Sequence, residues 1–320
     1  MPLPPIPLTP AFRHGVRTPW GGDMLRALFG KDIPDAPTGE SLELSALPGL
    51  ESRDPEGTPL SELLQARGPA LAGPDAAGEF PLLLKLLDAR EDLSVQVHPN
   101  SAYAGEKYGK QGKEEAWVIL DAKPGARLVL GFREGITRQD VEDALNDGRG
   151  LGGMLRLVPV RAGEAYLIPA GTVHAILGGI VLYEIQQSSD LTFRLHDWGR
   201  KDADGKPREL HLRESLDVMD VDSRPTAAVP VPVVSSEKGW EELLVSSPHF
   251  SVSRLSGCEA FPLLPDPRRF RVLTLLTEGT LESGGRRMQF PKGQTVLLPA
   301  DGMPASLTCG LALLGRPGRP

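Results

Sequence analysis

The sequence predicts a mainly β protein with a few short helices and two related barrel-like units. Its 320 residues include 36 glycines and 31 prolines, and valine-rich runs lie between them, which is typical of short strands joined by tight turns. The hydrophobic fraction of 40% excludes wholesale disorder. Residues 293–299 also copy residues 163–169 at an offset of 130 positions. Such a repeat predicts two units of the same architecture.

Two segments carry the signals of helices. Residues 137–146 begin with Thr137 as an N-cap, have acids in their first half and are followed by Gly148, so we expect a helix there. Residues 208–221 have leucines and a methionine near helical spacing, and we expect most of this segment to be a packing helix between the two barrels. Residues 1–80 are expected to be irregular with a few strands, and residues 68–78 to form a loop.

The boundary between the units is predicted by a segment rich in proline, alanine and valine, residues 225–234. This composition is typical of an extended linker. We therefore expect an N-terminal catalytic unit over residues 1–224, a linker over residues 225–235 and a C-terminal unit over residues 236–320.

Charge and composition exclude several classes of partner. The formal net charge is −7 and the isoelectric point is near 5.5, with no basic stripe that could replace the counterions of a nucleic acid. No apolar run approaches the roughly 20 residues that cross a bilayer, and the first residues lack a basic start followed by a long apolar stretch. We expect a cytoplasmic monomer or homodimer without membrane or nucleic-acid partners. Cys258 and Cys309 lack zinc-type spacing and are expected to be buried, reduced thiols.

Four polar residues are spaced as a metal site requires. On an extended strand, Ser94, Gln96 and His98 project from the same face. A carboxylate follows at Glu115, and a second imidazole at His174. Imidazole nitrogens and carboxylate or amide oxygens suit a hard-to-borderline dication such as zinc. Because Gln96 adds no negative charge, the ion would remain a strong Lewis acid toward a sugar oxygen.

The sequence around His174 resembles the second metal motif of the cupin superfamily. It contains Gly163, five residues, Pro169, one residue, Gly171, two residues and His174. We interpret residues 165–168 as a buried strand, residues 169–171 as a tight turn and residues 172–174 as the start of an antiparallel return strand, which forms a hairpin with the first. The copy at residues 293–299 is followed by no histidine. The resemblance therefore implies two cupin-like jelly-roll barrels, the second without metal ligands.

Nearly the whole chain resembles the type I mannose-6-phosphate isomerases in their short bacterial form. The resemblance depends on eight segments in the expected order, residues 20–22, 39–41, 83–89, 93–99, 113–120, 169–175, 184–190 and 206–210. It implies that the zinc ligands are Gln96, His98, Glu115 and His174, and that the active-site arginine is Arg194. The family's threonine or proline before the carboxylate ligand is Glu114 here. Strand alternation turns Glu114 to the opposite face, unless the strand register slips by one residue.

The reaction that the resemblance implies interconverts mannose 6-phosphate and fructose 6-phosphate through a cis-enediol. It needs a base to move a proton between C1 and C2, an electrophile and a cation for the phosphate. Zinc and Arg194 would provide the electrophile. Glu184 is our candidate for the base, with Lys113 or a zinc-bound hydroxide as the alternatives.

The candidates for phosphate binding are Lys85, Ser94 and Lys113. Ser94 shares the ligand face of its strand, and Lys113 shares the face of Glu115. Lys85 interrupts a run of leucines, where a charge is costly unless it is paired or functional. The structural alternative is that Lys85 reaches solvent or pairs with Asp88.

These residues are also compatible with two other function classes. Cupins also hold iron or manganese for oxygen chemistry, although the cations at Lys85, Lys113 and Arg194 favour an anionic substrate. A regulatory protein that binds a sugar phosphate without turnover is the second alternative. It is disfavoured because the ligands, Glu184 and Arg194 are all present.

Overall fold

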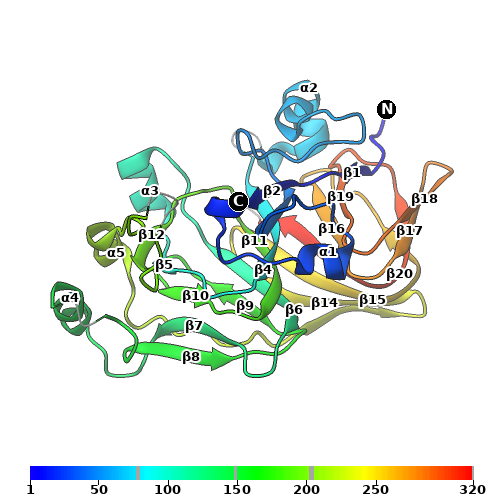
Figure 1. Cartoon of the computed structure of the whole chain (residues 1–320). Helices are drawn as coiled ribbons and strands as arrows, with labels where there is room; N and C mark the ends of the chain where they lie inside the picture. Colours follow the sequence, from blue (N-terminus) through cyan, green and yellow to red (C-terminus); the bar gives the residue numbers. More distant parts are fainter. Residues whose placement is uncertain (77–79, 148–149, 202–204, 319–320) are drawn as a thin grey trace.

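The computed structural model describes residues 1–76, 80–147, 150–201 and 205–318. In that part of the chain the strands form three antiparallel sheets, and short helices lie around them (Figure 1). The helices are α1 (Met24–Phe29), α2 (Leu60–Ala72), α3 (Ser101–Tyr108), α4 (Arg138–Asn146) and α5 (Leu212–Val218), with 3₁₀ turns at Gly15–Arg17 and Pro74–Ala76. Among these described helices, none is long and apolar enough to span a bilayer. The prediction of a mainly β protein is confirmed.

The N-terminal barrel consists of two facing sheets. The six-stranded sheet has the order β2 (Ala11–His14), β3 (Thr38–Leu44), β4 (Leu82–Ala89), β11 (Ile180–Gln187), β6 (Glu115–Ala122) and β9 (Ala165–Ile168). The five-stranded sheet has the order β12 (Phe193–His196), β5 (Val95–Val97), β10 (His174–Ile176), β7 (Arg127–Phe132) and β8 (Leu155–Pro159). Apolar side chains of both sheets, including Leu182 and Leu130, meet in the barrel interior. This is the two-layer arrangement of a jelly roll.

The outer face of the five-stranded sheet is covered by helices. Val95 and Phe193 of this sheet pack in one cluster with Val141 of α4 and Leu216 of α5. Helix α4 begins after Thr137, whose side chain accepts a hydrogen bond from the backbone N–H of Asp140 in a capping box. The predicted helix over residues 137–146 is thus confirmed, whereas Gly148 lies outside the described residues.

Helix α5 differs from its prediction in both length and place. It spans Leu212–Val218 rather than most of residues 208–221, because Met219 already has extended dihedral angles. It contacts β12, β5 and α4, and therefore lies on the N-terminal barrel at the end of the molecule away from the C-terminal sheet (Figure 1). The prediction of a helix between the two barrels is wrong. Leucine spacing indicates that a helix has an apolar face, but not which sheet that face covers.

The third sheet contains the C-terminal strands and one strand from the N-terminus. Its order is β1 (Ile6–Leu8), β19 (Thr295–Leu298), β16 (Arg271–Leu275), β20 (Ala305–Pro317), β15 (Phe250–Leu263), β14 (Gly239–Ser246) and β13 (Val231–Ser236), with β17 (Gly279–Ser283) and β18 (Arg286–Phe290) extending from β20. Strand β13 takes up the second part of the expected linker. Strand β1 pairs with β19, so the first residues of the chain join the C-terminal sheet.

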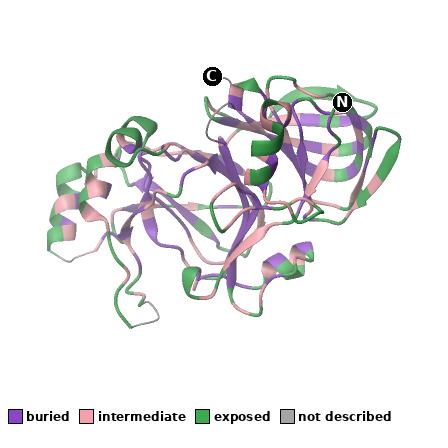
Figure 2. Ribbon diagram, turned by 90° about the horizontal axis from the view of Figure 1, so that it is seen from above, coloured by how far each residue is buried: buried purple, intermediate pink, exposed green. Residues whose placement is uncertain are grey.

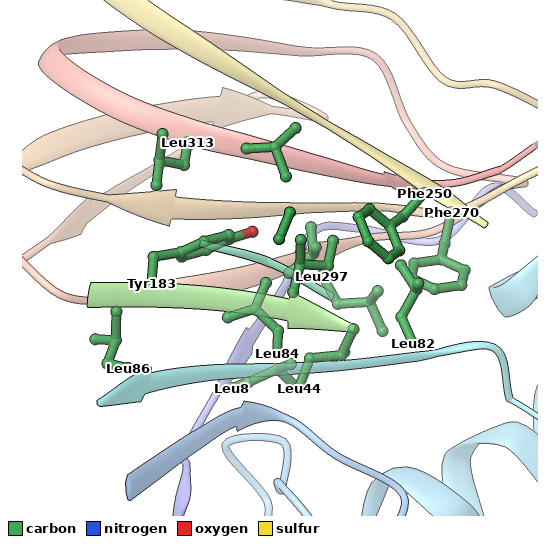
Figure 3. Packing of buried hydrophobic residues seen from close by; sticks show 14 of the residues in the cluster. Leu8, Leu44, Leu82, Leu84, Leu86, Tyr183, Phe250, Phe270, Leu297 and Leu313 are labelled. Atoms are coloured by element: carbon green, nitrogen blue, oxygen red, sulfur yellow. The ribbon is translucent and has the colours of Figure 1, made fainter. Parts of the chain in front are cut away.

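The six-stranded sheet is buried on both faces. Leu84, Leu86 and Tyr183 project from its outer face into a cluster with Phe250 and Leu313 of the C-terminal sheet (Figure 3). The intervening residues of the same strands project into the N-terminal barrel. Buried residues accordingly follow the central strands, whereas exposed residues gather on helices, on loops and on strands at the margin of the C-terminal sheet such as β13 (Figure 2). The C-terminal sheet therefore supports the strands whose inner face carries the polar residues described below.

The internal repeat is a structural repeat. Strand β9 (Ala165–Ile168) and strand β19 (Thr295–Leu298) occupy the same four positions of the two copies. Both copies begin with a glycine with positive φ, 93° at Gly163 and 86° at Gly293, a conformation that other residues rarely adopt. In the second copy the Gly293 carbonyl accepts a hydrogen bond from Lys31, and the Thr295 hydroxyl donates one to Glu43. The copy without ligands thus contacts the N-terminal unit.

Two local predictions need correction. Strands β9 and β10 do not pair as a hairpin, because β9 pairs with β6 and β10 pairs with β5 and β7 in the opposite sheet. The turn between them crosses from one layer of the barrel to the other. The expected loop over residues 68–78 is helical up to Ala72, with a break at Gly68 where φ is 44°, and residues 77–78 lie outside the described residues. Cys258 and Cys309 are free and buried, as expected.

Tyr183 provides a test of the contact between the two units. Its hydroxyl is buried among apolar side chains, and no described residue forms a hydrogen bond with it (Figure 3). The buried Tyr166 hydroxyl, in contrast, donates a hydrogen bond of 2.8 Å to Glu164. We expect Tyr183→Phe to leave the free energy of unfolding unchanged or to raise it by about 1 kcal/mol, and Tyr166→Phe to lower it by about 1–2 kcal/mol. Urea denaturation of both variants measures this, and a loss of more than about 1 kcal/mol in Tyr183→Phe would contradict the expectation.

Candidate active site

A pocket of about 320 Å³ opens between the two sheets of the N-terminal barrel, a size typical of small-ligand sites. Its lining includes six of the nine residues that the sequence predicted for the site, namely Lys85, Ser94, Gln96, Lys113, Glu184 and Arg194. The other three, His98, Glu115 and His174, are almost fully buried and contact this lining. The structure therefore brings all nine residues to one place from β4, β5, β6, β10, β11, β12 and the adjoining loops.

Three of these residues form a cluster of possible metal ligands. One donor atom each from His98, Glu115 and His174 lies within 4.8 Å of the others. The His174 Nε2 atom lies 3.3 Å from Glu115 Oε1, and the His98 Nε2 atom lies 3.5 Å from Glu115 Oε2. Glu115 is the first residue of β6 and projects into the barrel, so the strand register brings Glu115, rather than Glu114, into the cluster of possible ligands.

Backbone carbonyls orient both imidazoles. The Nδ1 atom of His98 lies 2.9 Å from the Leu191 carbonyl oxygen, and that of His174 lies 2.8 Å from the Thr172 carbonyl oxygen. Because a carbonyl only accepts hydrogen bonds, Nδ1 carries the proton in each ring and the Nε2 lone pair faces Glu115. This tautomer is the one that binds a metal through Nε2.

Burial keeps the two imidazoles neutral. Desolvation, reinforced by the nearby Lys113 ammonium, lowers the pKa of His98 to about 3. Desolvation also lowers the pKa of His174. Burial alone would raise the pKa of Glu115, but the neighbouring Lys113 ammonium helps to lower it well below its usual range. Two neutral nitrogen donors and one anionic oxygen donor are the protonation states that a cation requires.

The donor set fits a divalent cation. The Glu115 Oε1 atom is buried and, among the described residues, has no hydrogen-bond partner, so it is available as a ligand. Gln96 lies directly opposite His174 in the strand pair β5–β10, and its side-chain amide is 3.2 Å from His174 Nε2. Either end of the amide can face the cluster, because the oxygen and nitrogen of a glutamine are exchanged by a simple flip. Lys113 hydrogen-bonds to His98 Nε2 at 2.9 Å and also to Glu115.

Lys85 and Glu184 form a second buried group beside the cluster. They lie directly opposite each other on β4 and β11, and Lys85 Nζ is 2.9 Å from Glu184 Oε1. Lys85 also lies 3.5 Å from Glu40, which in turn accepts a hydrogen bond from Arg13 at 3.0 Å. Burial disfavours the ammonium, but the two carboxylates outweigh it and raise the pKa of Lys85. The alternatives of an exposed Lys85 or a pair with Asp88 are thus wrong, since Asp88 accepts a hydrogen bond from the backbone of Met24 instead.

A third group of charges lies at the mouth of the pocket. Arg194 and Arg208 line the pocket, and Asp197 forms ion pairs with Arg208 and with Arg200. Partial burial lowers the pKa of Arg194, and the neighbouring Arg208 adds to this effect. The Arg194 guanidinium donates to the Glu209 carbonyl at 2.8 Å. Asp197 is thus shared by two guanidiniums, and Arg194 donates to a neutral carbonyl, which leaves an excess of positive charge in this group.

The chain is similar to a family of known proteins. Residues 11–120 match the family model described as phosphomannose isomerase type I, catalytic domain. The chain is 38% identical over 285 residues to a mannose-6-phosphate isomerase of Streptococcus mutans, with 88% of each chain covered. It is 37% identical over 303 residues to the mannose-6-phosphate isomerase ManA of Bacillus subtilis, covering 92% of this chain and 93% of the relative.

The chain belongs to the type I phosphomannose isomerase family. Its structure superimposes on the crystal structure of the Bacillus subtilis mannose 6-phosphate isomerase with a TM-score of 0.89 at 32% identity, covering 98% of this chain and 99% of the other. A phosphomannose isomerase variant from Salmonella typhimurium shares the fold with a TM-score of 0.77 at 18% identity, covering 99% and 100% of the two chains. Family membership favours an isomerase over the oxygenase and regulator alternatives.

Several polar residues of this phosphomannose isomerase site were not predicted from the sequence. Glu40, Arg13 and Arg208 line the pocket, and Glu40 lies in the segment 39–41 that carried part of the family resemblance. The family resemblance therefore included Glu40 of β3, but it gave no sign of the partner of Glu40, Arg13. Arg208 lies in the segment 206–210 of the same resemblance, whereas Arg13 is a single arginine in a segment without a motif. Only the fold brings both arginines to the pocket.

Removing one imidazole tests the metal cluster. We expect His174→Ala to weaken the binding of a divalent cation by at least about 100-fold, because even the partners that only orient ligands contribute about 10–100-fold. Metal content after dialysis against a weak chelator, measured by atomic emission, reports the loss. The exposed His249 provides the matched control, and His249→Ala should retain the metal. Equal metal content in both variants would show that His174 is not a ligand.

Proposed function

We propose that the chain interconverts mannose 6-phosphate and fructose 6-phosphate, with one divalent ion, zinc, held by Gln96, His98, Glu115 and His174. The observation that carries the proposal is the convergence, in one pocket, of three groups. These are the metal ligands, the Lys85–Glu184 pair and the arginines at the mouth. They match the needs of aldose-ketose isomerisation for an electrophile, a base and an anion site.

The bound cation would supply Lewis-acid stabilisation to the oxygens at C1 and C2 of the open-chain sugar. Lys113, which contacts His98 and Glu115, would donate a hydrogen bond to the same oxygens. A fixed ammonium beside the ligands favours the negative charge that develops on the enediolate. This gives Lys113 a role both in substrate binding and in catalysis.

Glu184 is the proposed base. Its carboxylate projects into the pocket and is 2.9 Å from Lys85 Nζ. It would take the proton from C2 of the aldose and return it to C1 of the enediol, and the reverse reaction uses the same steps. Lys85 would keep the carboxylate oriented and balance its charge, while Glu40 and Arg13 hold Lys85 in turn.

The phosphate is proposed to lie at the mouth of the pocket against Arg194 and Arg208, with Ser94 as a hydroxyl donor. Lys85 and Lys113 are each already paired with a carboxylate, so their charge is largely neutralised. We therefore assign them to the sugar oxygens and the base rather than to the phosphate dianion. Planar guanidiniums also suit a phosphate, because they donate two parallel hydrogen bonds. A cytoplasmic location and a monomeric or homodimeric state stay predictions.

Turnover itself is the first test. Purified protein is incubated with mannose 6-phosphate in deuterated water and followed by NMR, with and without a chelator and with zinc added back. We expect fructose 6-phosphate to form, to stop forming with the chelator and to form again with zinc. Absence of turnover in protein that contains zinc would overturn the proposed function.

Glu184→Gln tests the base. We expect kcat to fall by roughly 100-fold to 10,000-fold, the range typical of general base catalysis, with little change in KM. The control is Glu241→Gln, because Glu241 is also a buried, ion-paired glutamate but lies in the C-terminal sheet with Arg316. A Glu184→Gln variant with a kcat within a few-fold of the unsubstituted enzyme would assign the proton transfer to another group.

Arg208→Ala tests the phosphate site. We expect KM for mannose 6-phosphate and the inhibition constant of inorganic phosphate to rise together by roughly 10–100-fold, because one charge-assisted pair is lost. The exposed Arg127 lies outside the pocket lining, and Arg127→Ala controls for the loss of one positive charge. If only kcat changed, Arg208 would act on the reacting end of the sugar and not on the phosphate.

A further inference from the structure

The candidate base has a second partner besides Lys85. Trp117 on β6 lies directly opposite Glu184 on β11, and its indole Nε1–H donates a hydrogen bond of 3.0 Å to Glu184 Oε2. Lys85, on the other side of β11, donates to Oε1. Each carboxylate oxygen therefore receives one N–H donor, from opposite flanking strands. The carboxylate cannot rotate without breaking one of these bonds.

The same tryptophan also contacts the metal cluster. Its ring packs edge-on against His174, with ring centroids 5.4 Å apart and an interplanar angle of 74°. Only 1% of Trp117 is exposed, so the surrounding barrel interior holds the ring in place. One rigid side chain thus sets the position of Glu184 relative to His174.

We propose that Trp117 is a positioning residue that aims the Glu184 carboxylate at the substrate carbons, an inference that rests on the proposed function. An indole N–H only donates and carries no charge, so Trp117 orients Oε2 without taking up the transferred proton. The lone pairs that remain on the two oxygens are then directed by the fold rather than by the substrate. A base oriented by a third group is a recurring arrangement in enzymes.

The test must separate the N–H group from the volume of the ring. Trp117→Phe removes both, whereas 3-benzothienylalanine placed at position 117 keeps the ring size and replaces N–H by sulfur. We expect both variants to lower kcat by about tenfold or more while KM stays within about twofold, since a hydrogen bond to a charged group is lost. Zinc content should stay at the level of the unsubstituted enzyme, which shows that His174 still binds the metal. Tyr166→Phe, which alters the residue next to Trp117 across the strand pair, is the control for packing and should leave kcat within about twofold.

The outcomes distinguish this inference from the function on which it rests. If the unsubstituted enzyme does not turn over mannose 6-phosphate, both fall together. If it turns over and the benzothienylalanine variant is equally fast, only the positioning role is overturned, even where Trp117→Phe is slow. A parallel loss of zinc in that variant would make Trp117 a support of the metal site and would also overturn the proposal.

A separate observation concerns the two cysteines, which none of the chemistry above uses. Cys258 on β15 and Cys309 on β20 are directly opposite each other, and the sequence contains no other cysteine. Directly paired positions on antiparallel strands have the Cα separation that a disulfide needs. Both residues line a hollow of about 810 Å³ in the C-terminal sheet, which gives small molecules access. The neighbouring Cys309 lowers the pKa of the Cys258 thiol.

We further propose that Cys258 and Cys309 form an oxidisable pair that a peroxide converts to a cross-strand disulfide. The Cys258 sulfur would attack a peroxide oxygen and become a sulfenic acid, and Cys309 would then displace water from that sulfur. In total, two thiols lose two electrons and two protons, and hydrogen peroxide is reduced to two waters. The proposal is independent of the isomerase function.

Thiol counting tests the pair. The native protein is treated with hydrogen peroxide, and the reaction is quenched. The protein is then unfolded and assayed for free thiols, and the masses of its peptides are measured by mass spectrometry. We expect two thiols to fall to none, one cross-linked peptide pair 2 Da lighter than the sum of its parts, and recovery of both thiols with dithiothreitol. In Cys309→Ser no cross-link should form. Two unreacted thiols, or oxygen adducts without a cross-link, would overturn the proposal.

Discussion

Four charged residues of the site, Glu40, Lys85, Glu115 and Glu184, lie on a sheet that is buried on both faces, and this constraint shapes the rest of the structure. Strands β4 and β11 send leucines and Tyr183 outward to the C-terminal sheet, while Lys85 and Glu184 project inward from the intervening positions. A charge in such a place is tolerated only when it is paired or hydrogen-bonded. Lys85 is accordingly bound between two carboxylates. The same pairing that makes the charges tolerable also holds them in fixed positions.

The surroundings of the cluster of possible metal ligands keep its two imidazoles neutral and its carboxylate ionised. Burial keeps His98 and His174 neutral, whereas Lys113 helps to keep Glu115 ionised. The carbonyls of Leu191 and Thr172 fix the tautomers. These contacts come from loops and strands of the five-stranded sheet, so both sheets are needed to assemble the cluster. The excess of positive charge is confined to the arginines at the mouth, where solvent and a substrate anion can reach it.

The C-terminal copy of the metal motif has no histidine and packs against the N-terminal unit. This copy keeps the glycine and the strand, but the backbone of Gly293 and the hydroxyl of Thr295 contact Lys31 and Glu43 of the N-terminal unit. Glu43 and Glu40 lie on the same strand, β3. The degenerate copy therefore supports, from the outer side, the sheet that presents Glu40 and Lys85 to the pocket. The N-terminal copy thus contributes to the site, and the C-terminal copy supports the sheet that carries the site.

Patterns of short range determined much of this protein from the sequence by itself. Glycine and proline spacing indicated strands, the Thr137 cap located α4, the repeat identified two related units, and the cupin motif located His174. These signals are local because backbone sterics and capping act over a few residues. Only the tertiary structure decided that β9 and β10 lie in opposite sheets, that α5 covers the N-terminal barrel, and that β1 joins the C-terminal sheet. It also decided which charges meet, as in Lys85 with Glu40 and Glu184, because strand order and register bring together residues that are 45 and 99 positions apart in the chain. Local sequence carries no information about such pairs.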